Sequence, residues 1–385
     1  MRNSYLPYGK QWLDDDDIQA VVNVLRSDYL TTGPEILEFE QVVAKYVGAK
    51  YAVAFANGTA AIHGTCFAAG IGEGDEVITT PITFAASANC VRYVNGKVVF
   101  ADIDEKTYNI NPKEIEKQIS EKTKAIIPVH FTGQPVDLDA IHEIAKKHNL
   151  VVIEDAAHAL GATYKGMKIG SLSDMTMFSF HPVKHVTTGE GGIITTNNET
   201  FYQMLLQFRS HGITRDKSLL QKDEGPWYYD MQFLGYNYRM TDIQAALGKS
   251  QMNKIDQFIE RRKEIVQKYN EAFSKLHEII TPYQSTNSES SWHLYIIQLK
   301  LDKLNATRRE IFEELINLNI GVNVHYIPVH TLSSYQQLGY KQGSLPKAEA
   351  LYERIITLPL FPKMTDDDVL DVINAVKEVI LKVKK

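Results

Sequence analysis

Lys184 and Asp155 are the residues of this chain whose types and positions are best suited to covalent chemistry. Lys184 ends the run Phe-Ser-Phe-His-Pro-Val-Lys at 178–184, and a glycine-rich stretch follows it. Asp155 ends the apolar run 151–155, which predicts a buried strand. In an open α/β sheet, ligand chemistry gathers at the carboxyl ends of the strands. We therefore expect an amine that can form an imine and a carboxylate that can hold a positive charge at one site.

A stretch earlier in the chain is suited to binding a phosphate. Gly58 and Thr59 follow the apolar run 51–55 and are expected to begin a helix, whose free N–H groups and dipole favour an anion. Ser179, five residues before Lys184, can add a hydroxyl group. Pyridoxal 5′-phosphate (PLP) requires this combination: a lysine for the Schiff base, a carboxylate for the pyridinium nitrogen and a place for the phosphate.

Each of these residues also has a simpler interpretation when it is taken alone. A lysine is usually exposed, and an aspartate at the end of a strand often caps the next helix. His158 follows Asp155 by three residues and faces the same side on a turn or helix start, although a single histidine is most often a packed or surface residue. A transaminating enzyme would use Lys184 to form the imine and to move a proton, and Asp155 to keep the cofactor ring protonated.

The order of the expected elements indicates an α/β fold. Between about residues 36 and 250, short apolar strands alternate with amphipathic helices, which predicts a mainly parallel sheet covered by helices on both faces. A long polar helix, about 252–276, leads into a region that mixes strands with capped helices. We expect an N-terminal arm at 1–13, a large PLP-binding domain at 14–252 and a smaller α+β domain at 253–385. The expected strands of the large domain include 76–79, 97–100, 125–129, 151–153, 175–178 and 192–195.

Three polar patterns mark expected helix starts. Thr307 with Glu310 and Thr365 with Asp368 have the spacing of a capping box. The acidic run 14–17 fits the first turn of a helix, where it complements the helix dipole, better than it fits a metal site.

The composition argues against several classes of protein. The 47 acidic and 41 basic residues give a net charge of −6 and are spread along the chain, so no basic surface for nucleic acid is expected. Cys66 and Cys90 are the only cysteines among 385 residues, which argues against disulfides and for a reducing compartment. No apolar stretch approaches about 20 residues, and the N-terminus has no apolar signal core. We expect a cytoplasmic protein that binds neither nucleic acid nor a membrane.

Several further segments of the chain occur in an order that identifies a protein family more specifically than any single segment does. Together they resemble the DegT/StrS family of nucleotide-sugar aminotransferases. That family has the fold-type-I PLP architecture, so the resemblance implies a PLP-dependent transaminase with a mainly parallel mixed sheet between helices. The segments are Leu-Thr-Thr-Gly-Pro at 30–34, Gly-Glu-Gly-Asp-Glu-Val-Ile at 72–78, Phe-Ala-Asp-Ile-Asp at 100–104, Glu-Asp-Ala-Ala-His-Ala-Leu-Gly-Ala at 154–162 and Leu-Gly-Tyr-Asn-Tyr-Arg-Met-Thr-Asp at 234–242.

The resemblance extends to one branch of the family. The segments 181–184, 235–239 and 324–330 are most similar to the branch that serves pseudaminic acid biosynthesis. That branch makes UDP-4-amino-4,6-dideoxy-N-acetyl-β-L-altrosamine from a UDP-linked 4-keto sugar, with L-glutamate as the amino donor. The resemblance therefore implies a UDP-sugar and L-glutamate as substrates.

The resemblance also assigns roles that spacing alone does not. Phe84 matches the family aromatic that stacks on the pyridine ring, whereas from the residues alone it is expected only in the core. His158 matches a position beside the ring. Asn237 matches a residue that reaches from a neighbouring subunit to the cofactor phosphate, which implies a homodimer with shared active sites. The expected contacts of the nucleotide sugar are Tyr8, Asp28, Tyr29, Leu30, Thr31, His325 and Tyr326.

Two other motifs have competing interpretations. Gly189, Gly191 and Gly192 fit a phosphate loop or, as we favour, a tight turn that enters a strand. His325 and His330 lack the helical spacing and the nearby cysteine of a zinc site, so no metal is expected.

Three other functions compete with the one that the resemblance implies. Some members of the family carry histidine in place of the lysine and dehydrate sugars, and Lys184 argues against that reaction. A catalytically silent protein that binds PLP or a nucleotide sugar is the alternative of a different class. A transaminase for another nucleotide keto-sugar, in a spore-coat or perosamine-type pathway, is the third alternative that the sequence leaves open.

Overall fold

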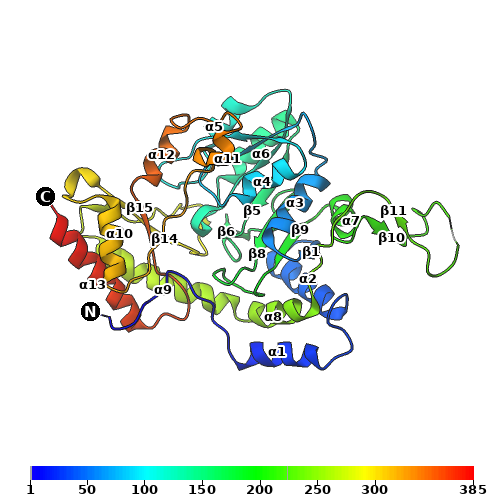
Figure 1. Ribbon diagram of the computed structural model, residues 1–385, viewed down its shortest axis with the longest axis horizontal. Helices are drawn as coiled ribbons and strands as arrows, with labels where there is room; N and C mark the ends of the chain where they lie inside the picture. Colours follow the sequence, from blue (N-terminus) through cyan, green and yellow to red (C-terminus); the bar gives the residue numbers. More distant parts are fainter. Residues whose placement is uncertain (1, 223) are drawn as a thin grey trace.

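A seven-stranded sheet forms the centre of the larger part of the protein (Figure 1). The computed structural model describes residues 2–222 and 224–385; residue 1, the first of the expected arm, and residue 223 lie outside the described part. The strand order is β1-β9-β8-β5-β4-β2-β3. The strands are β1 (Tyr51–Phe55), β2 (Glu76–Thr79), β3 (Lys97–Phe100), β4 (Thr123–Ile127), β5 (Val151–Asp155), β8 (Met175–Ser179) and β9 (Gly192–Thr196).

Only β9 runs against the other strands of this sheet. It pairs antiparallel with β8 on one side and with β1 on the other, and the pairs β2–β3, β2–β4, β4–β5 and β5–β8 are parallel. The predicted mainly parallel mixed sheet is confirmed. Because β1, β5 and β8 all point the same way, the residues that follow them emerge at one edge of the sheet.

Helices cover both faces of the sheet because the strand residues alternate between two apolar clusters. Val53, Phe55 and Ile127 pack with helices α3, α4 and α7, while Ala54 and Ile126 pack with α2, α5, α6 and α8. Such strands, buried on both faces, are typical of parallel sheets. The helices of this part are α1 (Asp15–Leu25), α2 (Pro34–Val47), α3 (Gly58–Ala68), α4 (Ala86–Tyr93), α5 (Pro112–Gln118), α6 (Leu138–His148), α7 (Glu199–Phe208) and α8 (Asp242–Met252).

A second, smaller sheet lies beside the C-terminal helix, with the order β12-β14-β15 (Figure 1). Its apolar face packs on α9, α10 and α13. The N-terminal arm lies on this part, because the Leu6 N–H donates to the Asn319 carbonyl and the Leu360 N–H donates to the Tyr8 carbonyl. The elements are β12 (Ile279–Ile280), β14 (Tyr295–Leu299), β15 (Ile355–Leu358), α9 (Ile255–Phe273), α10 (Arg308–Asn317), α11 (Ser333–Gln336), α12 (Pro346–Tyr352) and α13 (Asp366–Val383).

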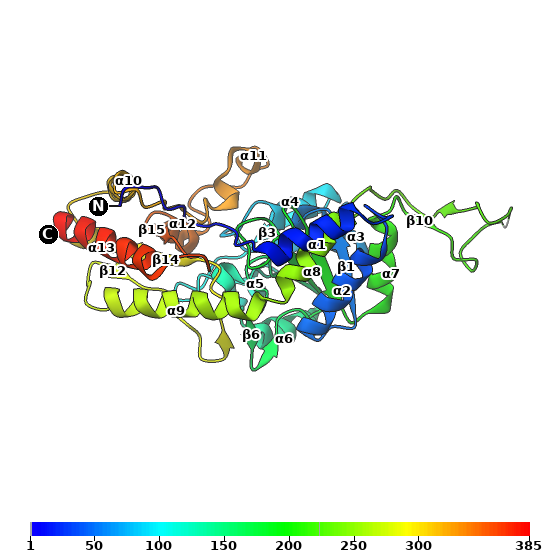
Figure 2. The same cartoon turned by 90° about the horizontal axis from the view of Figure 1, so that it is seen from below.

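The helix expected at about 252–276 is shorter than predicted at both ends. It is α9, which begins at Ile255 and ends at Phe273. Met252 belongs to the preceding helix α8, and the two helices follow one another along one side of the molecule in both views (Figures 1 and 2). The break falls at Asn253, whose N–H bonds to the carbonyl of Ser250 in a tighter turn than an α-helix makes.

The predicted helix starts are confirmed. Thr307 with Glu310 and Thr365 with Asp368 form reciprocal capping boxes at α10 and α13. Asp14 caps α1, and the three aspartates after it occupy the first turn. Among the described residues, no cluster of histidine, cysteine, aspartate and glutamate could hold a metal ion, and no helix is long and apolar enough to cross a membrane.

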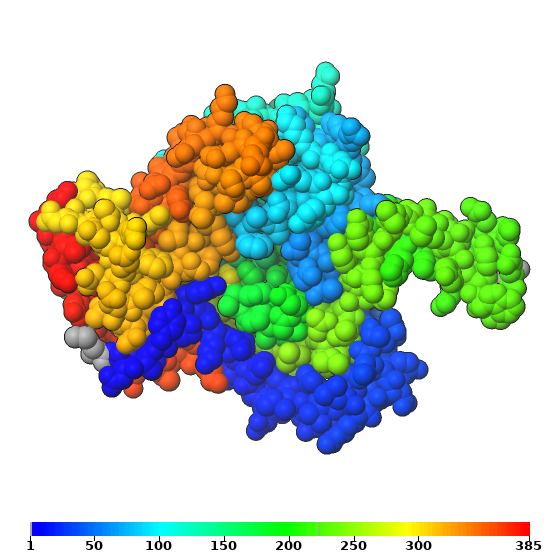
Figure 3. All heavy atoms as spheres, viewed as in Figure 1, coloured from blue at the N-terminus to red at the C-terminus, as the bar shows by residue number. Residues whose placement is uncertain are grey.

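A hairpin arm, residues 213–222 and 224–236, extends away from the body of the protein (Figures 1 and 3). It contains the short antiparallel pair β10 (Ile213–Thr214) and β11 (Asp230–Met231). Large apolar side chains of the arm are exposed: Leu219, Trp227, Tyr229, Met231 and Leu234. A third small sheet consists of β13 (Ser288–Glu289), β6 (Thr163–Tyr164) and β7 (Met167–Lys168).

Candidate active site

Lys184 and Asp155 come together at the carboxyl edge of the large sheet. Lys184 lies in the loop after β8, where its N–H closes a turn onto the His181 carbonyl at 2.9 Å. Burial lowers the pKa of Lys184 to about 8, against the opposing charge of Asp155. Its amine therefore loses its proton more readily than that of an ordinary lysine, and a neutral amine is the form that attacks a carbonyl carbon.

Asp155 ends β5 in a buried setting, with 5% of its surface exposed. Ser87 Oγ donates to its Oδ2 at 2.6 Å, and the Ala157 N–H donates to Oδ1 at 3.1 Å. Burial raises the pKa of Asp155, while these two hydrogen bonds and the charge of Lys184 act in the other direction. A buried carboxylate of this kind is suited to pairing with a positive charge on a ligand.

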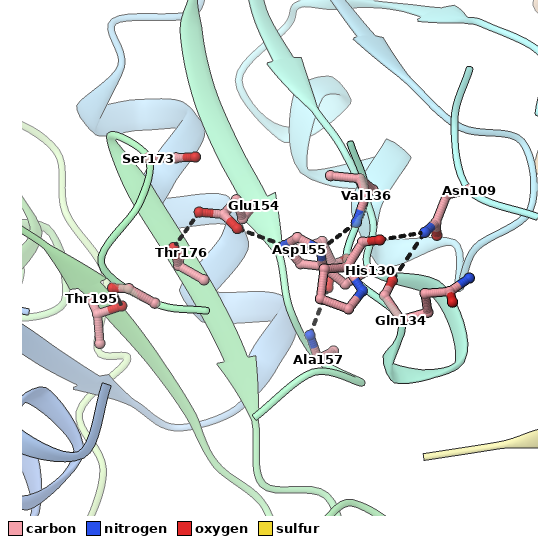
Figure 4. A network of polar contacts seen from close by, with 12 residues as sticks. Asn109, His130, Gln134, Val136, Glu154, Asp155, Ala157, Ser173, Thr176 and Thr195 are labelled. Atoms are coloured by element: carbon pink, nitrogen blue, oxygen red, sulfur yellow. Dashed lines mark hydrogen bonds and ion pairs between the residues drawn. The ribbon is translucent and has the colours of Figure 1, made fainter. Parts of the chain in front are cut away.

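Behind Asp155, a buried network holds the backbone of β5 (Figure 4). His130 Nε2 and Glu154 Oε2 are 2.6 Å apart, and Thr176 Oγ1 donates to the other oxygen of Glu154 at 3.1 Å. His130 Nδ1 accepts the Val136 N–H at 3.1 Å, so we assign its proton to Nε2, from which it is donated to Glu154. The pair then carries one negative charge. The backbone N–H of His130 donates to the Asp155 carbonyl at 3.0 Å, which fixes the strand end.

Buried aromatic and imidazole rings line the space in front of Lys184. The rings of His158 and His293 are 4.3 Å apart, and Tyr326 Oη lies 3.2 Å from His158 Nε2. His325 lies next to Tyr326 with its Nδ1 2.9 Å from Thr357 Oγ1. Burial and the charge of Lys184 hold the pKa of His158 well below its usual value, and the same causes lower that of His325 to about 3. These imidazoles are therefore neutral near pH 7.

The start of α3 forms a cradle for an anion at the same sheet edge. Asn57 Oδ1 accepts the Ala60 N–H at 2.8 Å, which leaves the N–H groups of Gly58 and Thr59 without an intrahelical partner. A β-carbon at Gly58 would lie 3.2 Å from Ser179 Oγ. The serine hydroxyl and the helix start are therefore neighbours, as a phosphate site requires.

Gly192 closes the back of this cradle. A β-carbon there would lie 2.6 Å from the Asn57 carbonyl oxygen and 2.8 Å from Gly58 Cα. Gly192 is the first residue of β9, and Gly189 has a positive φ of 77° in the turn before it. The tight-turn interpretation of 189–192 is confirmed.

The residues present fit PLP. The cradle of Gly58, Thr59 and Ser179 matches the phosphate, and the amine of Lys184 and the carboxylate of Asp155 match the reactive carbon and the ring nitrogen. The Nδ1 atoms of His158 and His293 are buried without a hydrogen-bond partner among the described residues, as expected beside a bound polar ligand.

Phe84 corrects one interpretation made from the residues alone. Its ring is 62% exposed, so the expectation of a core position is wrong. It lies in the turn before α4, where Ser87 donates to its carbonyl, and its ring centroid is 6.3 Å from that of Tyr326. This position leaves the ring free to cover a ligand held above Asp155. Tyr8 lies on the other side of the same space, with its ring 5.2 Å from that of His325.

Asn237 and the stretch 28–31 are not part of this group of residues in the single chain. Asn237 is exposed and pairs with Ser210 at the base of the hairpin arm. Residues 28–31 are exposed, and Thr31 pairs with Thr241. None of the contacts described joins them to Lys184. His325 and His330, which were considered above as a zinc pair, have different partners: His325 bonds to Thr357, while His330 Nε2 lies 2.9 Å from Glu349 Oε1.

Several residues of the site were missed by the analysis of the sequence. They are Ser87, His130, Glu154, His185, Arg262 and His293. The short polar stretch Ser-Ser-Trp-His at 290–293, directly before an apolar strand, is the one signal that could have indicated His293.

The fold and this site define a PLP-dependent aminotransferase. Residues 11–377 match the model of the DegT/DnrJ/EryC1/StrS aminotransferase family. The chain belongs to this family of PLP-dependent enzymes and is a sugar aminotransferase.

Individual relatives agree with this assignment. The chain is 44% identical over 381 residues to the spore coat polysaccharide biosynthesis protein SpsC of Bacillus subtilis, covering 98% of both chains. It is 38% identical over 383 residues, 99% of both chains, to the UDP-4-amino-4,6-dideoxy-N-acetyl-beta-L-altrosamine transaminase of Campylobacter jejuni. The structure of Helicobacter pylori PseC, an aminotransferase involved in the biosynthesis of pseudoaminic acid, superposes with a TM-score of 0.92 at 32% identity, covering 98% of this chain and 100% of that one.

Proposed function

We propose that the protein transfers the amino group of L-glutamate to a UDP-linked 4-keto-6-deoxy-N-acetylhexosamine. The product would be UDP-4-amino-4,6-dideoxy-N-acetyl-β-L-altrosamine, a precursor of pseudaminic acid. The observation that carries this proposal is the group formed by Lys184, Asp155 and His158 with His325 and Tyr326 directly in front of them. The segment that supplies the last two residues is among those most similar to the pseudaminic acid branch.

Each residue of this group has a task in such a transfer. Bound PLP supplies an electron-withdrawing ring on which an amino group can be carried from one substrate to the next. Lys184 would bind the reactive carbon of the cofactor and, when its amine is released, move a proton at the substrate carbon. Asp155 would hold the ring nitrogen in its charged form. Gly58, Thr59 and Ser179 would hold the phosphate.

The neutral rings around Lys184 would orient the sugar and exclude water. His158, His325 and Tyr326 are neutral near pH 7, because burial lowers the pKa of the two imidazoles and raises that of the phenol. They can donate or accept hydrogen bonds to hydroxyl groups of a sugar without adding charge beside Lys184. Tyr8, whose ring lies beside that of His325, would contact the nucleotide sugar.

We propose further that two copies of the chain complete one another's sites in a homodimer. Asn237 and residues 28–31 are exposed, and none of the contacts described joins them to Lys184 in their own chain, although the family resemblance expects them at the cofactor phosphate and the nucleotide sugar. The hairpin arm next to Asn237 exposes 71% of Trp227 and 76% of Leu234. Exposed apolar groups on an extended segment are typical of a surface that binds another protein.

A second candidate is a transaminase for a different keto-sugar nucleotide in a spore-coat type of pathway. The identity of 44% to SpsC supports it, since this exceeds the identity of 38% to the Campylobacter transaminase. Both candidates use the same residues for the cofactor and differ in the configuration of the sugar.

The deciding experiment is a product assay with a panel of UDP- and dTDP-linked 4-keto-6-deoxy sugars, analysed by mass spectrometry and NMR. Turnover confined to the UDP-linked N-acetyl sugar, with the L-altro product, would support the first candidate. Turnover of a different sugar, with none of the L-altro product, would support the second. In the same preparation, bleaching of the cofactor absorbance on adding glutamate would contradict the alternative of a catalytically silent binding protein.

A further inference from the structure

The segment 290–293 is held against the Lys184 loop from several directions. Ser291 Oγ donates to the His158 carbonyl at 2.9 Å, and His185 Nε2 donates to the Ser291 carbonyl at 2.9 Å. The His293 N–H donates to the Thr132 carbonyl at 2.8 Å. These bonds connect three loops of the large sheet with the entry to β14.

The backbone of this segment is strained. Trp292 has a φ of 52°, in the left-handed region that a bulky side chain rarely adopts. Thr132, which accepts the His293 N–H, has a φ of 61°. Strained residues persist where the surrounding structure determines them, and they gather at functional sites. The next residue, His293, has its side chain beside Lys184.

A buried arginine fixes the same turn. Arg262 is 1% exposed and has no carboxylate partner among the described residues. Its Nη1 instead donates to the carbonyls of Trp292 at 3.2 Å, His293 at 3.2 Å and Leu360 at 2.8 Å. A buried cation is ordinarily paired with an anion. Because Arg262 instead donates to three backbone carbonyls, we infer that it holds the backbone of residues 292 and 293 in position.

The side chain of His293 meets the amine of Lys184. Its Nε2 lies 3.3 Å from Lys184 Nζ, while its Nδ1 is buried without a partner among the described residues. Burial and the charge of Lys184 hold the pKa of His293 well below its usual value. The imidazole is therefore neutral while Lys184 keeps its proton, and Nε2 accepts the hydrogen bond from the ammonium group.

We propose that His293 is a positioning residue that holds the amine of Lys184 whenever that amine is not bonded to the cofactor. The proposal rests on the proposed role of Lys184. A lysine side chain has four flexible carbons, and its amine must return to one carbon atom in each half of the reaction. An acceptor fixed by Arg262 keeps the released amine inside the site.

The test is the rate at which the cofactor-free, full-length protein captures added PLP, followed by absorbance across a range of pH. In the wild type, capture should rise with pH with a midpoint near 8, the pKa of Lys184. His293→Phe removes the acceptor of the ammonium group, so the midpoint should fall by about one pH unit. His293→Gln restores an acceptor and should return the midpoint toward that of the wild type.

His63→Phe is the matched control. His63 is as buried as His293, at 4% exposed, but it belongs to α3, where its ring packs edge-on against the rings of Phe208 and Tyr236 rather than against Lys184. Its midpoint should match that of the wild type. Circular dichroism should verify the fold of each variant, and His293→Leu replaces His293→Phe if the larger ring prevents folding.

Two outcomes would overturn the role of His293: an unchanged midpoint in folded variants without the acceptor, or an equal change in His63→Phe, which would indicate a general effect of packing. Failure of the underlying function looks different. Borohydride would then trap the cofactor on a lysine other than Lys184 in the wild type, whatever the midpoint does in the His293 variants.

Discussion

The site around Lys184 and the hairpin arm differ in where their side chains find partners. At the site, Asp155 and Glu154 are at most 5% exposed and accept hydrogen bonds from their own chain. On the arm, Trp227 and Leu234 are more than two-thirds exposed. Buried polar groups are stable only when they are partnered, whereas exposed apolar groups gain stability by meeting another molecule. The site around Lys184 is therefore stabilised by contacts within its own chain, whereas the hairpin arm is suited to contact with another molecule.

This difference separates two kinds of variant. Changes at the buried site should act on chemistry within each chain, and changes at the base of the arm should act only through a second copy. The predictions below test this separation, beginning with the largest effect.

Lys184→Ala should lower turnover by about 10³-fold or more, because no other amine can replace it at the reactive carbon. The thermal midpoint of unfolding should stay close to that of the wild type, since the lysine side chain contributes little packing. Borohydride should trap the cofactor on Lys184 in the wild type, as peptide mapping can show. The exposed Lys122 offers a control whose replacement by alanine should have no effect on turnover.

Asp155→Asn should keep the cofactor bound but lower the rate of the half-reaction with glutamate by on the order of 10². The reason is that the ring nitrogen loses its charge partner. Stopped-flow absorbance measures this rate directly, and Asp137→Asn, at the cap of α6, serves as the control. A wild-type rate in Asp155→Asn would assign the carboxylate a purely structural role.

Mixing inactive Lys184→Ala and Asn237→Ala subunits under exchange conditions should restore activity toward half that of the wild type per dimer. One of the two sites in each mixed dimer would then contain both residues. The experiment requires that Asn237→Ala alone is severely impaired and that mass spectrometry shows exchange. No recovery between subunits that do exchange would place Asn237 in the site of its own chain and remove the contrast between the two regions.

Thr365→Ala should have the smallest effect, because it changes neither region. It removes the side chain that caps α13, which should lower the free energy of unfolding by about 1 kcal/mol. Urea denaturation should detect the change, while turnover and subunit exchange stay at wild-type values. A loss of turnover here would mean that the small sheet region is coupled to the site.

Much of the large sheet could be predicted from the sequence because its signals are local. Each buried strand is a short apolar run, and Asp155 and Ser179 mark strand ends that parallel pairing must bring to one edge. The capping boxes at Thr307 and Thr365 were predicted for the same reason, since both partners lie within one turn.

The rest of the site depends on contacts between distant elements. Arg262 belongs to α9, yet it bonds to carbonyls before β14 and after β15. No periodicity in the sequence reports such a contact. Phe84 was expected in the core because large aromatic residues usually are, and only the position of the turn before α4 shows that its ring is exposed.

The crowding at Gly192 also restricts how this protein can change over generations. Every single-base change of a glycine codon that alters the amino acid introduces a β-carbon, and at Gly192 that carbon would lie within 2.8 Å of the backbone of Asn57 and Gly58. No single coding step away from glycine avoids the collision. A lineage could replace Gly192 only after an earlier mutation had moved the start of α3. The order in which the two mutations arise would therefore decide whether the replacement is tolerated.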